Sequence, residues 1–215
     1  HEKHAIFMKV PYIEQMTAAE LSQFKELEWS TSLPEVAQRW KERLAKAIAN
    51  YQIPEPALMN LYRANLWHVL ITTDRDLPTG LYEHGAGTYE YPMYANEAMM
   101  VARSLEMRGE HEEARRLFEP CLVSQGVKPL PGNFKSQEGL LYAAAPKGYD
   151  YYTAQGYNMH HGFILWAVAE HYLWTRDKQY LQTVAPNLVA ACDWITRERK
   201  ATMILAPNGS KPLEW

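Results

Sequence analysis

Carboxylates, histidines and tyrosines gather in a few short stretches of this chain, and together these residue types suit carbohydrate chemistry. The stretches include LYEHGAGTYEY at 81–91, YANEA at 94–98 and a Gly-, Pro- and Tyr-rich region at 127–157 that leads into two adjacent histidines. Pyranose rings stack on aromatic faces, while carboxyl groups act on hydroxyls and on the glycosidic oxygen. Hydrolysis of a glycosidic bond needs two such carboxyls.

Two glutamates are the candidate catalytic acids, Glu97 and Glu138. Glu97 precedes Val101 by four residues, which predicts a position at the top of the buried stripe of its helix. Each has a competing interpretation, because acids are favoured in any first helical turn and Glu138 precedes a glycine in a loop. The candidate substrate-binding residues are Glu83, His84, Tyr89, Tyr91, Tyr94, Asn96, Asp150, His160 and His161.

Structural roles compete with binding roles for several of these side chains. The tyrosines at 89, 91 and 94 could pack the loop, and His160 and His161 could form hydrogen bonds near a helix cap. Histidines 84, 160 and 161 have no recognised metal-binding spacing, so the sequence predicts neither a metal nor a cofactor. Trp166 is expected to pack in the core.

The helices that position these residues have a regular order. Helical spacing of apolar residues predicts helices over about 94–108 and 110–126, then over about 158–174 and from Asp177 to about Lys200. Short turns around Gly109 and Arg176 alternate with long connections at 73–93 and 127–157. Tyr94 and Asn158 begin equivalent helices 64 residues apart. All the long loops should therefore lie at one end, where the first helical turns line a cleft.

The N-terminal part follows a different pattern. Residues 4–13 are β-like up to Pro11, Thr17 and Glu20 form a capping box, and Ser32 with Pro34 begins a second helix that runs to about Tyr51. Further helix is expected from Pro54. We therefore predict an all-α fold with a short N-terminal β-like segment, a linker region at 1–53 and helical hairpins over 54–215.

Composition narrows the class of partner. The chain has 215 residues and a net charge of -3, with no long basic run, which argues against nucleic acid and anionic membranes. No apolar run reaches the 18 residues of a membrane span. The two cysteines are expected to be buried thiols, and the cellular compartment stays open. The chain starts at His1, so a removed leader or an upstream domain is possible.

Two stretches resemble the six-hairpin, (α/α)6-toroid glycosidases. HHGFILWAVAEHYLWTRDKQYLQTVAPNLVAACDWI is similar to one hairpin of that superfamily, and YANEAMMVARSLEMRGEHEEARRLFEPCL to the preceding hairpin. The resemblance covers about residues 55–200 and implies carbohydrate hydrolysis by paired acids in a cleft at the loop end. It also implies that the chain holds about three hairpins, the front part of a longer ring. Apolar faces such as residues 163–169 would then need covering, which predicts either self-association or a remainder of the ring that this chain lacks.

Two other functions stay open. A sugar isomerase or epimerase on the same fold would move protons with His160 or His161 in place of a carboxyl pair. A non-enzymatic helical-repeat scaffold is the other alternative, since RGEHEEARRLF also resembles a tetratricopeptide segment. The long aromatic-rich loops favour the enzymes, because such arrays use short and uniform turns.

Overall fold

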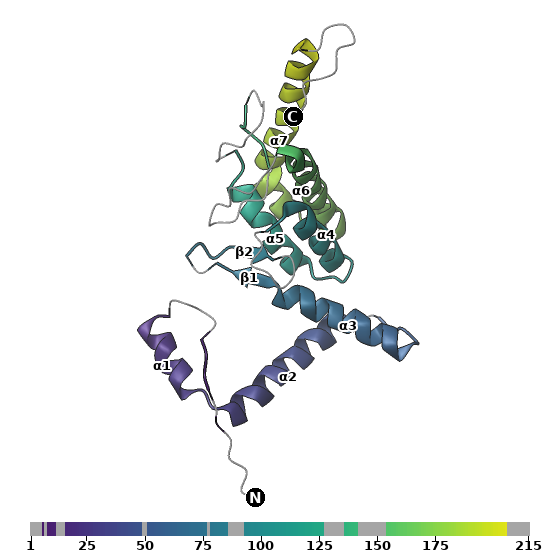
Figure 1. The fold of residues 1–215 in the computed structure, drawn as a ribbon. Helices are drawn as coiled ribbons and strands as arrows, with labels where there is room; N and C mark the ends of the chain where they lie inside the picture. Colours follow the sequence, from purple (N-terminus) through teal and green to yellow (C-terminus); the bar gives the residue numbers. More distant parts are fainter. Residues whose placement is uncertain are drawn as a thin grey trace, which may run out of the picture. The chain divides into compact units, whose positions relative to one another are not determined.

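A computed structural model describes residue 6 and residues 8–11, 16–48, 51–76, 78–85, 93–126, 136–141 and 154–205. The chain divides into two compact units, His1–Gln52 and Ile53–Trp215. The first unit contains α1 (Ala18–Glu26) and α2 (Trp29–Ile48) (Figure 1). The predicted capping box is confirmed, because the Glu20 amide donates to Thr17 Oγ1 while the Glu20 carboxylate accepts from the Thr17 amide.

The start of α2 differs from the prediction. The helix begins at Trp29, ahead of Ser32, and contains Pro34. The amides of Thr31 and Ser32 donate to Glu28 O, so the first turn is already closed before the proline, whose missing N–H costs little near a helix start.

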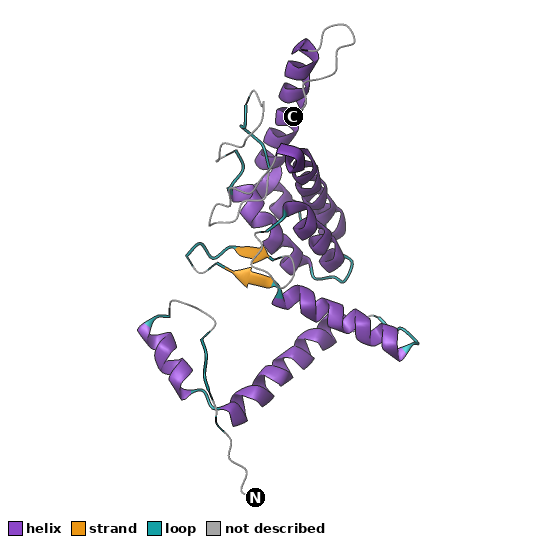
Figure 2. Ribbon diagram, viewed as in Figure 1, coloured by secondary structure: helices purple, strands orange, loops and turns teal. Residues whose placement is uncertain are grey.

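In the described residues of the second unit, the regular secondary structure is helical apart from one small hairpin (Figure 2). It contains α3 (Pro56–Ile71), α4 (Ala95–Glu106), α5 (His111–Val123), α6 (Ala154–Thr175) and α7 (Lys178–Leu205). The strands β1 (Thr73–Arg75) and β2 (Tyr82–His84) pair antiparallel, with Thr73 opposite His84. The all-α class is confirmed. The short β element lies here, while residues 6 and 8–11 adopt no regular secondary structure.

The two predicted short turns are present and have the expected backbone geometry. Gly109 ends the α4–α5 turn with φ 77°, and Arg176 connects α6 to α7 with φ 56°. Glu106 and Arg103 of α4 contact His171 and Glu170 of α6, so α4 and α6 run in the same direction. The turns therefore lie at one end of the bundle and the starts of α4 and α6 at the other.

The hairpins α4–α5 and α6–α7 repeat, and their second helices begin 67 residues apart, at His111 and Lys178. The turn residues with positive φ, Gly109 and Arg176, have the same spacing. The first helix of the second hairpin differs from the prediction, because α6 begins at Ala154, four residues before the expected start at Asn158. The earlier start places His160 and His161 in the second helical turn instead of the first.

Alanines are frequent in the core of the second unit. The core includes the fully buried Ala95, Ala98, Ala102, Ala114 and Ala191 beside Met99, Leu117 and Phe118. Small side chains let helix axes approach closely, and the larger residues fill the space between them. Among the helices that the structure describes, none is long and apolar enough to cross a membrane.

Arg176 has a left-handed backbone conformation that glycine adopts without a Cβ penalty. We expect Arg176→Gly to raise the free energy of unfolding by about 1 kcal/mol relative to Arg176→Ala, because both variants lose the cation–π contact with Tyr172 and only glycine relieves the backbone. Urea denaturation followed by circular dichroism measures the difference. Equal stability of the two variants would contradict the assignment of the turn.

Candidate functional site

The two candidate acids both have exposed side chains at the end of the bundle where α4 and α6 begin. Glu97 is in the first turn of α4 and Glu138 is in the connection between α5 and α6. The expected position of Glu97 on the buried stripe is wrong. Burial falls on positions 95, 98, 99 and 102, and Glu97 points away from that side. Asn96 and Tyr94 beside it are half-buried.

His160 and His161 are buried rather than open to a cleft. His161 is 2% exposed and uses both of its ring nitrogens. The amide of Leu141 donates to Nδ1 at 3.0 Å, which leaves the proton on Nε2, where it is shared with Ala191 O at 3.2 Å. His161 is thus a neutral bridge between α6, α7 and the connection.

Burial lowers the pKa of both histidines below the ordinary value of 6.5. For His161, the Leu141 amide also donates to Nδ1, the nitrogen to which a second proton would have to bind. Because burial lowers these pKa values below 6.5, both imidazoles are neutral at physiological pH.

Residues 136–141, here called the clamped segment, are fixed by hydrogen bonds from several elements. At its start, the Ser136 amide donates to Glu198 Oε1 at 2.9 Å and Ser136 O accepts from Trp194 Nε1 at 2.7 Å. Both partners lie on α7, one helical turn apart. The segment is therefore held to α7 by two side chains, one of which binds the amide and the other the carbonyl group of Ser136.

Further bonds fix the middle and the end of the clamped segment. Arg197 donates to Glu138 O, and the Glu138 amide donates to Ser136 Oγ. Gln125 donates to Gly139 O at 2.8 Å, and the Gly126 amide donates to Leu140 O at 3.0 Å. The backbone that carries Glu138 is thus rigid while its carboxylate remains exposed to solvent.

Gly139 makes this attachment possible. Its φ is +87°, and a Cβ at this position would lie 2.2 Å from Ala190 O on α7. Contacts below 3 Å between a Cβ and a backbone oxygen do not occur in proteins, so only glycine lets the segment lie directly on α7.

Glu83 and His84 lie in another part of the unit. Both are in β2, which packs on α5, and Arg116 of α5 stacks over the Tyr82 ring at 4.8 Å. The Thr73 hydroxyl donates to Val69 O, so His84 Nδ1 donates to Thr73 Oγ1, at 3.2 Å. Burial lowers the pKa of His84. The structure does not connect this pair with His161 through any contact that it describes. Tyr89, Tyr91 and Asp150 lie outside the described residues.

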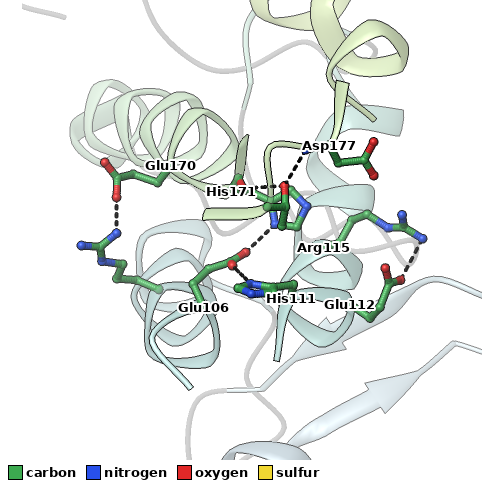
Figure 3. Close-up of polar contacts among 9 residues, drawn as sticks. Glu106, His111, Glu112, Arg115, Glu170, His171 and Asp177 are labelled. Carbon is green, nitrogen blue, oxygen red and sulfur yellow. Dashed lines mark hydrogen bonds and ion pairs between the residues drawn. The ribbon is translucent and has the colours of Figure 1, made fainter. Parts of the chain in front are cut away.

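Two buried carboxylates, Glu198 and Glu106, were not among the residues that the sequence predicted for a site. Glu198 anchors Ser136, as described above, and Glu106 lies at the end of α4 with 3% exposure. Glu106 accepts from His171 Nδ1 with one oxygen and from His111 Nδ1 with the other, and Figure 3 shows it between the two rings. An acid in the last turn of a helix opposes the macrodipole, and that unfavourable position was the available signal for Glu106.

The Glu106 cluster is satisfied by its own partners and ties three helices together at the short-turn end. Both carboxyl oxygens of Glu106 have a hydrogen-bond partner, as burial of a polar group requires. Within the described ranges, no three His, Cys, Asp or Glu side chains are arranged to hold a metal ion.

Comparison of the chain with protein-family models, with curated proteins and with solved structures gives no match.

The contact of Gly139 with Ala190 can be tested by adding one methyl group. We expect Gly139→Ala to lower the free energy of unfolding by several kcal/mol, because it combines backbone strain with a collision against a helix backbone. Gly109→Ala is the matched control, since its φ is also positive but no atom lies within 4 Å of the added Cβ; it should cost about 1 kcal/mol. Urea denaturation compares the two, and equal losses would contradict the close approach.

The neutral bridge of His161 makes stability depend on pH. Because its pKa is lowered in the folded protein, the unfolded chain binds a proton between pH 6.5 and the folded pKa while the folded protein does not. The contribution of His161 is complete above about pH 6.5 and is lost as the pH falls below it. Urea midpoints measured from pH 7.5 to 5 should decline, and less steeply in His161→Asn.

His68→Asn, which replaces an exposed histidine on α3, is the control. A slope unchanged in His161→Asn but reduced in His68→Asn would contradict the assignment.

Proposed function

We propose that this chain is part of a carbohydrate-active protein, a glycoside hydrolase that uses paired carboxylates. The ligand site would lie at the end of the bundle where α4 and α6 begin. The observation that carries the proposal is the clamped segment, which holds Glu138 on a fixed backbone while leaving its carboxylate exposed. Pre-organisation of this kind suits a group that must meet a substrate in one geometry.

Glu97 supports the same location. Its helix begins at the same end of the bundle, its side chain is exposed, and the adjacent Tyr94 and Asn96 are partly accessible. In this proposal Glu97 and Glu138 supply the two carboxyl groups, one as the general acid and the other as the base or nucleophile. The tyrosine-rich connections supply aromatic side chains on which sugar rings stack. The (α/α)6 ring that the sequence resembles belongs to the same proposal.

The alternative of an isomerase or epimerase is less favoured by the histidine geometry. His161 has both ring nitrogens engaged with backbone groups, so it has no free nitrogen with which to move a substrate proton. A helical-repeat interaction scaffold is favoured by a separate observation, the exposed apolar side chains of α6 and α7, among them Leu173, Val189 and Ile195.

Hydrolysis of a glycan panel by the chain, measured as release of reducing ends, tests the proposal. We expect Glu138→Gln to lower turnover by about 100-fold or more if it acts as general acid or base, and Glu97→Gln to do the same if it is the partner. Binding of the glycan should persist in both, because the amide keeps the shape of the side chain.

Glu112→Gln is the matched control, since Glu112 is also an exposed first-turn glutamate but begins α5 at the short-turn end. Turnover that both site variants leave unchanged would remove these acids from the mechanism. Absence of glycan binding and hydrolysis by the unmodified chain would contradict the proposed function as a whole.

A further inference from the structure

One side of α7 holds the clamped segment, and we call this side the α7 contact face. Its members recur at intervals of three and four residues, so they share one side of the helix. They are Ala190, Trp194, Arg197 and Glu198. Two of them bind the amide and the carbonyl group of Ser136, and another lies against Gly139. The clamped segment therefore takes its course from a single helix.

Arg197 differs from the other members of this face in its exposure and in its partner. Trp194 and Glu198 are 3% and 2% exposed, whereas the Arg197 side chain is exposed to solvent. Its guanidinium donates to the carbonyl oxygen of Glu138. In the contacts that the structure describes, Arg197 is thus the member of the contact face that bonds to the candidate acid itself.

The bond from Arg197 acts on the peptide group between Glu138 and Gly139. A glycine adopts either sign of φ, so this peptide group has more than one orientation available unless its carbonyl is bound. The preceding peptide group is held separately, because the Glu138 amide donates to Ser136 Oγ at 3.2 Å. Arg197 therefore selects the backbone angle ψ of Glu138.

The backbone angles of Glu138 in turn affect its side chain, because they determine which rotamers a residue can adopt. A single backbone conformation limits the positions that the exposed carboxylate can take. Misplacement of a reacting group by about 1 Å can lower a rate by about 100-fold. A bond to the backbone of Glu138 is therefore able to change catalysis without touching the substrate.

We propose that Arg197 is a positioning residue for Glu138 in glycan hydrolysis. This role rests on the proposed function, because it requires Glu138 to act on the substrate. Arg197 holds the Glu138 carbonyl on α7, and the carboxylate is thereby restricted to the orientations that this backbone conformation allows. Arg197 acts through Glu138 and not through a bond to the sugar.

Steady-state kinetics of Arg197→Ala and Arg197→Lys test this role, with the glycan of the panel that the unmodified chain hydrolyses fastest. We expect Arg197→Ala to lower kcat by about tenfold or more while KM changes by less than about twofold, because the lost interaction serves the transition state and not substrate binding. Arg197→Lys should keep most of kcat, since an ammonium group can also donate to the carbonyl.

Arg199→Ala is the matched control. Arg199 is also an exposed arginine of α7, but it lies two residues further on, away from the contact face, so kcat and KM should not change. Hydrogen–deuterium exchange of residues 136–141, followed by mass spectrometry, gives a readout that needs no turnover. Exchange should be faster in Arg197→Ala than in Arg199→Ala, and circular dichroism shows whether both variants keep their helices.

Failure of this role and failure of the proposed function give different results. An active chain in which Arg197→Ala keeps its kcat would overturn the role and leave the glycosidase proposal in place. A raised KM at unchanged kcat would also overturn it, because Arg197 would then bind the substrate directly. Absence of hydrolysis by the unmodified chain would contradict the proposed function and the role with it, even if Arg197→Ala still increased exchange.

Discussion

A hairpin of two helices cannot bury its own apolar sides, so every hairpin in this protein depends on the neighbour that covers it. The contact between α4–α5 and α6–α7 satisfies that constraint with a core rich in alanine, and with Arg103 of α4 over two tryptophan rings of α6. The charged groups at this contact are paired or stacked: Arg103 with Glu170, and Glu106 with two histidines. Arg108 extends the scheme to α3, where it donates to Tyr62 O and lies 3.9 Å from the Tyr62 ring.

The clamped segment depends on the same contact. Its hydrogen-bond partners come from α6, from α7 and from the turn after α5, so its position requires both hairpins to be packed together. Gln125 and Asn187 bond to each other across the two hairpins, and Gln125 also donates to Gly139 O. An ordered backbone without regular secondary structure is thus maintained by side chains that already serve the interface. Any group displayed by the segment takes its position from helix packing.

Sequence patterns predicted the elements whose signals are local. The capping box at Thr17, the turns at Gly109 and Arg176 and the stripe through Ala98, Ala102 and Leu105 all follow from spacing and residue type. The predictions from sequence patterns were wrong or incomplete where a tertiary contact determines the position of a residue. The Glu97 side chain is exposed, because the buried stripe of α4 includes Met99 and leaves out position 97. In the same way, α6 begins four residues before Asn158. Nothing local indicates that Glu198 accepts from an amide 62 residues away, or that Gly139 rests on Ala190.

Arg103 shows what a charged residue requires where one hairpin packs on the next. An arginine at a hairpin edge is stable when rings and a carboxylate of the next hairpin surround it, as Trp166, Trp174 and Glu170 surround Arg103. Without those partners a half-buried guanidinium would lose hydration with no compensating contact. The arginine and the neighbouring hairpin therefore depend on each other.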